Sequence, residues 1–231
     1  MNGLMQAGTT NPLPAVGIVP SGTGSDFVRS LGVPRRLEEA CRRLAAPESV
    51  SRDLGVISFD GGEAAPSGRY FVNAAGLGFD GEVVKRCNGL SRFARGTIPY
   101  LASLAATLLT YQRGEVVLTL DRVLHRRRIA SVVVALGSYF GGGMRIAPNA
   151  LLHDGLFDVI TVGDVGRLEL VRNVPGLYSG AHLLHPAVLE ERAFRARVES
   201  DQQVLIQADG ELLGRLPADF QLLPGAISFV R

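Results

Sequence analysis

The segment "FGGGMRIAPNALLHDGLFDV", residues 140–159, joins three consecutive glycines to an arginine and then to a turn that contains a carboxylate. Glycines 141–143 cost chain entropy and add nothing to a core, so the backbone here must bend sharply or approach another group closely. Arg145 follows at a position where a guanidinium could meet phosphate. Asp154 lies in a turn beside backbone carbonyls, and such oxygens can hold a hard cation such as magnesium. A tight Asp-Gly hairpin turn without a metal is the alternative interpretation of Asp154.

Upstream, the segment "VPSGTGSDF", residues 19–27, lies between an apolar strand-like run and an Arg-rich helix-like run. Gly22 and Gly24 would let backbone N–H groups approach phosphate oxygens, and Thr23 would add a hydroxyl donor at the positive end of the following helix. Taken alone, this pattern favours a plain strand-to-helix turn over a phosphate cradle.

Two further segments place glycine and acid at strand ends. In "FVNAAGLGFDGEVV", residues 71–84, Asp80 either caps a helix or lies at the edge of a site. In "IQADGELLG", residues 206–214, a strand-end turn explains Asp209 and the glycine after it, while Glu211 is a candidate general base for a hydroxyl group. Each segment alone is common, so the functional prediction depends on the set.

Composition bounds the class of protein. The chain of 231 residues is 46% hydrophobic and 20% charged, which predicts a globular protein with a substantial core. Its 24 basic and 22 acidic residues give a formal net charge of +2. This near balance lacks the excess of positive charge that is typical of nucleic-acid-binding proteins. Cys41 and Cys87 lack the spacing of a disulfide framework or a zinc site. The start shows no signal-peptide pattern, and the longest apolar run, residues 98–111, is too short to span a membrane, so we expect a cytoplasmic protein.

The order of patterns along the chain predicts the α+β class. Residues 15–46 are typical of a strand followed by two helices. After residue 48 the pattern changes to antiparallel hairpins and short alternating runs, as in a sandwich, with helical patterns at about 91–112 and 166–178. Arginines 126–128 are expected at a solvated hairpin tip, with attraction to an anionic membrane surface as the alternative.

In this order and spacing, the four segments resemble the diacylglycerol kinase catalytic family, which includes bacterial soluble lipid kinases and, more distantly, sphingosine and ceramide kinases. Residues 17–34 are similar to its P-x-G-T-x-N-D-F-A-R segment, and residues 71–84 to its strand-then-Gly-Phe-Asp segment. Residues 140–159 are very similar to its G-G-G-x-x-I-A-P-x-A-x-x-x-D-G segment, and "ADGE" at residues 208–211 completes the series. The resemblance covers essentially the whole chain.

The resemblance implies a fold in which an α/β nucleotide-binding domain precedes a β-sandwich domain, with the active site between them. Residues 1–48, joined by the C-terminal strand at about 222–231, would then be the C-terminal part of the α/β nucleotide-binding domain. Residues 49–221 would form an antiparallel β-sandwich domain with inserted helices, which binds the lipid substrate.

The resemblance also implies an ATP-dependent lipid kinase that uses Mg²⁺ and transfers the γ-phosphate to a lipid hydroxyl. Phosphoryl transfer of this kind needs positioning and charge neutralisation more than covalent chemistry from the protein. Glu211 would deprotonate the lipid hydroxyl. The positions implied are, for ATP, Gly22, Thr23 and Gly24; for catalysis, Glu211 and Asp209; for Mg²⁺, Asp154 with the main chain near Leu151 and Leu156; and for substrate or phosphate, Gly142, Gly143 and Arg145.

Two departures from the family pattern qualify this expectation. The family's G-G-D-G-T signature, followed by a helix resembling N-E-V-x-N-G-L, should precede the glycine loop, whereas "MNGLMQ" at residues 1–6 resembles only the end of that helix. We therefore expect an N-terminally truncated chain that alone cannot bind ATP normally or turn over. Ser25 stands where relatives usually carry asparagine, which changes a detail of the loop's contacts but not the fold.

Two other functions remain open at this stage. One is a related NAD kinase, disfavoured by residues 141–148 and 153–159; the other is a catalytically silent lipid-binding module. The partner expected is a lipid alcohol at a membrane surface, with peripheral membrane association, and a homodimer is a further alternative. Diacylglycerol, phosphatidylglycerol, a sphingoid base and an undecaprenyl-like alcohol all need an apolar cleft and a hydroxyl, so the sequence does not name the lipid.

Overall fold

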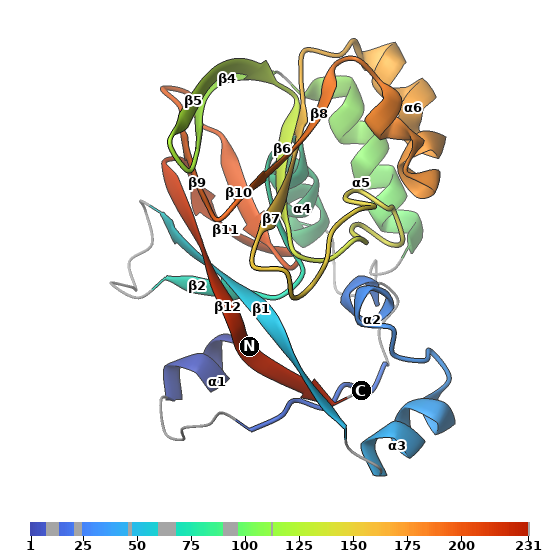
Figure 1. Cartoon of the computed structure of the whole chain (residues 1–231). Helices are drawn as coiled ribbons and strands as arrows, with labels where there is room; N and C mark the ends of the chain where they lie inside the picture. Colours follow the sequence, from blue (N-terminus) through green and yellow to red (C-terminus); the bar gives the residue numbers. More distant parts are fainter. Residues whose placement is uncertain are drawn as a thin grey trace.

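The structure is a computed structural model of the 231-residue chain. The residues that it describes are 1–7, 14–20, 25–45, 48–59, 68–89, 97–111 and 113–230. Within them, two antiparallel β-sheets of six strands each pack face to face, and helices cover the outer side of one sheet (Figure 1). The predicted α+β class with an antiparallel β-sandwich is confirmed.

Strands distant in sequence alternate within each sheet, so neither sheet is a simple run of hairpins. In spatial order, the first sheet contains β2 (Arg69–Phe71), β1 (Ser49–Phe59), β12 (Ala218–Val230), β9 (Arg195–Glu199), β4 (Gly114–Leu120) and β5 (Val123–Ile129). The second sheet contains β11 (Glu211–Arg215), β10 (Leu205–Ala208), β3 (Ala74–Gly78), β6 (Ser131–Ala135), β7 (Phe157–Val162) and β8 (Val188–Ala193).

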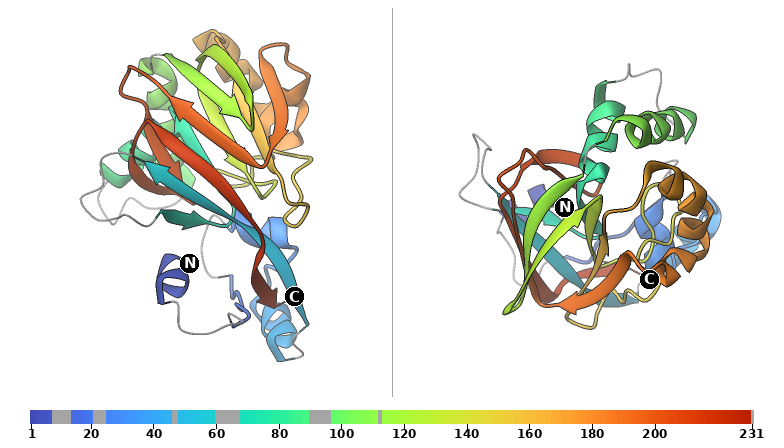
Figure 2. Two further views of the ribbon diagram at one scale, coloured as in Figure 1. Left: turned by 60° about the vertical axis from the view of Figure 1, so that its left-hand side comes forward. Right: turned by 90° about the horizontal axis from the view of Figure 1, so that it is seen from above.

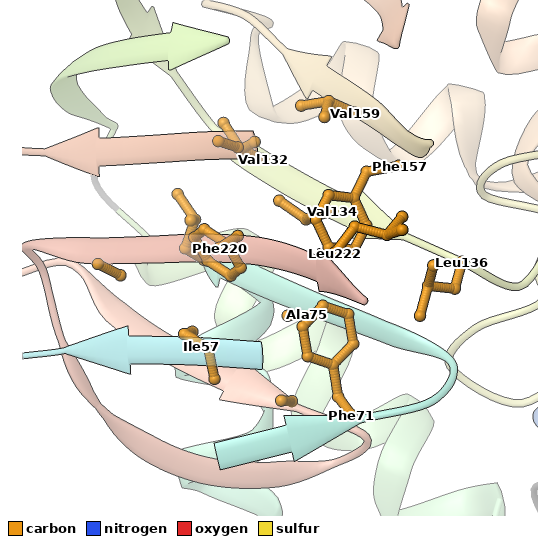
Figure 3. Packing of buried hydrophobic residues seen from close by; sticks show 14 of the residues in the cluster. Ile57, Phe71, Ala75, Val132, Val134, Leu136, Phe157, Val159, Phe220 and Leu222 are labelled. Atoms are coloured by element: carbon orange, nitrogen blue, oxygen red, sulfur yellow. The ribbon is translucent and has the colours of Figure 1, made fainter. Parts of the chain in front are cut away.

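The main core lies between the two sheets, because each sheet turns one row of apolar side chains toward the other. Phe71 of β2 stacks on Phe157 of β7, with ring centroids 5.8 Å apart, and meets Phe220 of β12 edge-on at 6.5 Å. Figure 3 shows these rings among Ile57, Leu222 and other buried side chains. Each large side chain buried in this way stabilises the fold by roughly 1.5–3 kcal/mol.

Helices cover the opposite face of the second sheet. Its strands β3 and β6 are buried along their whole length, so both of their faces are covered. The cover consists of α4 (Phe79–Gly89), α5 (Thr97–Thr110), α6 (Arg167–Ser179) and the short 3-10 helix η1 (Ala181–Leu184), grouped on one side of the molecule (Figures 1 and 2). Helices α5 and α6 correspond to the predicted helical patterns.

An ion pair links the two sheets at each of their edges. Arg127 of β5 lies 2.6 Å from Glu191 of β8, and Arg69 of β2 lies 2.5 Å from Glu211 of β11. The prediction that arginines 126–128 form a hairpin tip was therefore wrong. They lie within β5, because the tight turn of the β4–β5 hairpin comes earlier, after Leu120, where β4 ends.

The N-terminal helices α1 (Asn2–Ala7), α2 (Asp26–Leu31) and α3 (Leu37–Ala45) lie on the side of the sandwich where β1 begins and β12 ends (Figure 2). Within the described residues, the strand predicted at residues 15–20 is reduced to a single parallel bridge between Val16 and Phe229. The reason is that its backbone hydrogen bonds go to the end of β12, where Val16 N–H donates to Ser228 O and the Val16 carbonyl oxygen accepts from Val230 N–H.

Strand β12 is one long strand where the sequence predicted two short ones. Its pairing with β1 shifts register between Arg52 and Leu54, opposite Pro224 and Gly225. A bulge at this point accommodates the proline, which has no N–H to donate to the ladder, so the strand continues past it. The bulge also takes Asp53 out of the regular ladder and makes its side chain available for other contacts.

Candidate functional site

A cavity of about 490 Å³ lies between the outer face of the second sheet and helices α4, α5 and α6. Most of the side chains around it are apolar. They include Val83, Leu104, Leu108, Val133, Leu170, Leu177 and Val188. Its volume and apolar lining are those of sites that bind small molecules. Leu104 and Leu108 come from α5, within the apolar run at residues 98–111.

One end of the cavity, here called the polar end, is formed by Asp26, Asn73 and Asp209. Hydrogen bonds connect the elements that meet there. Asn73 Nδ2 donates to the Tyr139 carbonyl at 2.9 Å, and Tyr139 N–H donates to Ser30 Oγ of α2 at 3.3 Å. Segments that lie far apart in the sequence thus converge at the polar end.

Asp26, the first residue of α2, faces the loop that contains glycines 141–143, here called the glycine-rich loop. Its Oδ2 accepts a hydrogen bond from Gly142 N–H at 2.7 Å. Burial raises the pKa of the Asp26 carboxyl, although the N–H groups of Gly142 and Gly143 and the charge of Arg29 act against the rise. Its Oδ1 is buried and makes no hydrogen bond within the described part of the chain. Sequence reasoning did not identify Asp26 as functional.

The predicted substrate positions Gly142 and Gly143 both have positive φ, of 87° and 104°. The φ of Gly143 is one that residues with a Cβ rarely adopt, so the loop needs glycine there, where it lies beside the Arg29 guanidinium of α2. Arg145 is not among the residues that line the cavity, whereas its neighbours Met144 and Ile146 are. The structure thus brings the loop to the cavity through Gly141, Met144 and Ile146, and does not bring Arg145 to the cavity lining.

Asp209 is held in a turn with a positive φ of 48°. Its carboxylate accepts hydrogen bonds from the N–H groups of Val72, Asn73 and Ala74 at 2.9, 3.1 and 3.2 Å. Desolvation raises the pKa of Asp209, and the three N–H donors act in the opposite direction. The geometry makes Asp209 a group that positions the start of β3.

Glu211, the predicted general base, begins β11 two residues after Asp209. Its side chain is 67% exposed, and it pairs with Arg69 of β2. It is not among the residues that line the cavity. The structure thus places Glu211 near the polar end along the sequence but turned toward the sheet edge, where Arg69 neutralises its charge.

Asp154 and the buried Asp53 both accept hydrogen bonds from the turn at residues 154–156. Asp53 Oδ2 accepts from Gly155 N–H and its Oδ1 from Gly225 N–H, both at 2.8 Å. Asp154 accepts from Leu156 N–H at 3.2 Å and forms an ion pair with Arg192. Sequence reasoning missed Asp53, although a carboxylate directly before the apolar part of a strand was a usable signal.

The predicted Mg²⁺ ligands are the Asp154 carboxylate and the main chain near Leu151 and Leu156, which are the hard oxygen donors that Mg²⁺ prefers. Within the described ranges, no three His, Cys, Asp or Glu side chains cluster as metal ligands. The donor types fit the ion. The charge on Asp154 is already neutralised by Arg192, so a cation would have to share or displace that partner.

Asp80 lies in the wall of the cavity. It is the second residue of α4, so the interpretation of Asp80 as the helix cap was wrong: the helix begins at Phe79. Its Oδ2 accepts a hydrogen bond from Ser131 Oγ at 3.0 Å. Burial raises its pKa to about 7, with the Ser131 hydrogen bond opposing the rise.

The predicted ATP positions Gly22, Thr23 and Gly24 lie outside the described residues, so their placement stays a prediction. Among the helices that the structure describes, none is both long and apolar enough to cross a membrane.

Two protein families match the chain. Residues 73–231 match the YegS C-terminal NAD kinase beta sandwich-like domain, and residues 1–57 match the diacylglycerol kinase catalytic domain. A relative from Mycobacterium tuberculosis (strain ATCC 25618 / H37Rv), named diacylglycerol kinase, is 32% identical over 229 residues, which are 97% of this chain and 71% of the relative. A diacylglycerol kinase of Bacillus subtilis (strain 168) is 27% identical over 208 residues, 90% of this chain and 66% of the relative.

A solved structure of a diacylglycerol kinase from Bacillus anthracis str. Sterne has the same fold. Its TM-score is 0.68 at 21% sequence identity, and the match covers 94% of this chain and 67% of that one. At this level of identity the similarity concerns the fold, and it agrees with the two-sheet architecture described above.

Proposed function

This chain belongs to the diacylglycerol kinase family, and on that premise we propose that it binds a lipid alcohol and takes part in transferring the γ-phosphate of ATP to its hydroxyl group. Diacylglycerol is the substrate that we propose first, because the relatives are named for it.

The observation that carries this proposal is the apolar cavity with a polar end. Transfer of a hydrocarbon chain from water to an apolar wall, such as that formed by Val83, Leu104 and Leu170, is favourable. A hydroxyl at the head of the chain would then lie at the polar end, beside Asp26 and Asn73. This arrangement supports a substrate that is apolar along most of its length and polar at one end.

In the proposed reaction, the lipid hydroxyl oxygen attacks the γ-phosphorus of ATP, its proton passes to the Glu211 carboxylate, and ADP leaves. Because Glu211 pairs with Arg69 in this structure, its carboxylate must turn away from Arg69 to accept the proton. Asp209 would act as a positioning residue, since its oxygens are engaged by the backbone of residues 72–74.

We place ATP at Gly22, Thr23 and Gly24, where backbone N–H groups and one hydroxyl would bind phosphate oxygens. Mg²⁺, held by Asp154 and the main chain near Leu151 and Leu156, would offset phosphate charge when bound. Gly142 and Gly143, which α2 holds through Asp26, would present backbone to the phosphate or the substrate.

We assign residues 1–48 and about 222–231 to the nucleotide side of the site, and residues 49–221 to the lipid side. The parallel bridge between Val16 and Phe229 supports the first grouping, since it joins the two parts. A substrate of this kind resides in a bilayer, so we also propose that the protein works at a membrane surface.

The test measures transfer of labelled phosphate from ATP to dioleoylglycerol in mixed micelles with Mg²⁺. Two forms are compared, namely residues 1–231 and the same chain extended at its N-terminus by a segment that carries the family's G-G-D-G-T signature. We expect the extended form to be active and Glu211→Gln to lower its kcat by about 100-fold or more. Glu115→Gln, which changes an exposed carboxylate of β4, is the matched control and should leave the rate unchanged.

Parallel reactions distinguish the other functions. Phosphorylation of NAD in place of the lipid would indicate an NAD kinase. Lipid co-sedimentation without phosphate transfer in the extended form would indicate a lipid-binding module. A fully active Glu211→Gln variant would exclude the base assigned here.

A further inference from the structure

The mechanism proposed above makes no use of Asp80, although this carboxyl lies in the wall of an otherwise largely apolar cavity. An unpaired carboxylate in such surroundings is costly, because transfer of charge out of water is opposed unless a partner compensates. Ser131 donates to Oδ2 at 3.0 Å, and no other hydrogen bond to the carboxyl is formed within the described residues. The second carboxyl oxygen is therefore available to a molecule in the cavity.

The position of Asp80 is built into the sheet. Gly76 of β3 pairs with Gln207 on one side and Val133 on the other, so the three residues form one row across the second sheet. A Cβ on Gly76 would lie 2.4 Å from Asp80 Oδ2 and 2.7 Å from Gln207 Nε2. The carboxyl thus occupies the space that a side chain at residue 76 would fill.

The groups around Asp80 favour its neutral form. Tyr111, after α5, interacts electrostatically with Asp80 and supplies no positive charge, and Glu82, in the same first turn of α4, is itself an acid. Ser131 and Gln207 are neutral. Desolvation raises the pKa of Asp80 to about 7, so near neutral pH a substantial fraction of the carboxyl carries a proton that it can donate.

We propose that Asp80 is a specificity-determining residue of the lipid site, whose carboxyl, oriented by Ser131, donates a hydrogen bond to an ester carbonyl oxygen of an acylated glycerol. This inference rests on the proposed function and names the chemical feature of the lipid that the cavity recognises. This hydrogen bond would distinguish glycerides from alcohols such as polyprenols, which carry no second oxygen near the hydroxyl.

The spacing along β3 agrees with this assignment. Asp209 holds the backbone at Ala74, while Asp80 lies against Gly76, and residues two apart in a strand share one face at a separation of roughly 6.5–7 Å. In a glyceride, an ester carbonyl lies only a few bonds from the free hydroxyl. A hydroxyl at the polar end therefore brings a carbonyl oxygen within reach of Asp80.

The test measures equilibrium binding of two labelled lipids to the full chain in detergent micelles. The lipids are dioleoylglycerol and its dioleyl ether analogue, which lacks only the carbonyl oxygens. We expect the diester to bind about 10-fold more tightly than the diether, the difference that one hydrogen bond in an apolar site supplies. Asp80→Leu should lower this ratio to about one by weakening the diester alone.

Further variants separate recognition from structure. Asp80→Asn keeps an N–H donor and should retain most of the ratio, Ser131→Ala should lower it, and Glu82→Gln, on the same helix, should leave it unchanged. Circular dichroism establishes that each variant is folded. If Asp80→Leu does not fold, the ratio is measured on the unaltered chain at pH 6 and pH 8.5, and it should fall at the higher pH as Asp80 loses its proton.

Equal affinity for the two lipids in the unaltered chain, or equal weakening of both by Asp80→Leu, would overturn the role of Asp80 while leaving the lipid kinase proposal intact. Absence of binding to either lipid would overturn both proposals together.

Discussion

Asp26 Oδ2 accepts a hydrogen bond of 2.7 Å from Gly142 N–H, although 116 residues separate the two in the chain. The contact joins the first residue of α2 to the glycine-rich loop and so holds together two of the segments that the sequence singled out. Gly142 has a positive φ of 87°, and the hydrogen-bond partner of its N–H is this carboxylate and not the loop's own backbone.

Removal of the Asp26 carboxylate should loosen this junction. Asp26→Ala leaves the Gly142 N–H without its partner, which costs about 1–3 kcal/mol of the free energy of unfolding. Asp26→Asn is the matched control, because its amide oxygen can still accept the hydrogen bond. Urea denaturation followed by circular dichroism measures both variants, and equal stability of the two would show that the bond contributes nothing.

A side chain at residue 76 should disturb the cavity wall. In Gly76→Ala the new Cβ would lie 2.4 Å from Asp80 Oδ2, so the carboxyl must move, and we expect a loss of about 1–3 kcal/mol of stability. Gly89→Ala, at the end of the same α4 helix, is the control, since a Cβ there meets no atom within 4 Å. Thermal unfolding of both variants checks the prediction, which fails if Gly76→Ala is as stable as Gly89→Ala.

The raised pKa of Asp80 has a consequence for stability. The folded chain binds this proton up to a pH of about 7, whereas the unfolded chain releases it near the ordinary value of 3.8. Between these values the native state binds more protons, so the contribution of Asp80 to stability is lost as the pH rises, by at most about 4 kcal/mol. Asp80→Asn should therefore stabilise the chain more at pH 8 than at pH 4. Denaturation curves at the two values would contradict this if the difference between variant and unaltered chain did not change with pH.

Loss of either ion pair between the sheets should lower stability by a similar small amount, but loss of only one of the two should lower the reaction rate. Arg69→Gln and Arg127→Gln each remove one partly exposed pair, at a cost of about 1 kcal/mol or less. Arg69 pairs with Glu211, whereas Arg127 pairs with Glu191, so in the phosphate-transfer assay proposed above we expect Arg69→Gln to lower kcat at least about fivefold and Arg127→Gln to leave it unchanged. Equal rates in the two variants would remove Arg69 from the positioning of Glu211.

The class of fold and most of its helices could be predicted from the sequence because they depend on local patterns. A helical pattern at about 91–112 indicated α5, whose Leu104 and Leu108 prove to be buried, and alternating runs indicated the strands. The course of β12 through Pro224 could not be predicted, because a bulge in β12, which depends on its pairing with β1, accommodates the proline. The predicted position of arginines 126–128 at the hairpin tip was also wrong, since the position of the turn depends on the pairing of β4 with β5.

For the candidate site, the sequence identified the segments but assigned roles to the wrong members in some of them. The glycines of the 140–159 segment were singled out, whereas Asp26 and Asp53, which receive hydrogen bonds from that segment, were not. Both are acids beside apolar residues, and only a partner distant in sequence distinguishes such an acid from an ordinary surface residue.

By itself, the sequence determined the family, the α+β class and the four segments that carry glycine and acid, because these depend on residue types at short spacing. Only the tertiary structure decided which carboxylates face the cavity and which face one another. It turned Glu211 toward Arg69, engaged Asp209 with the backbone of β3 and set Asp80 against Gly76 in the cavity wall. The physical reason is that the environment of a carboxyl is created by strands and helices that the chain brings together from far apart.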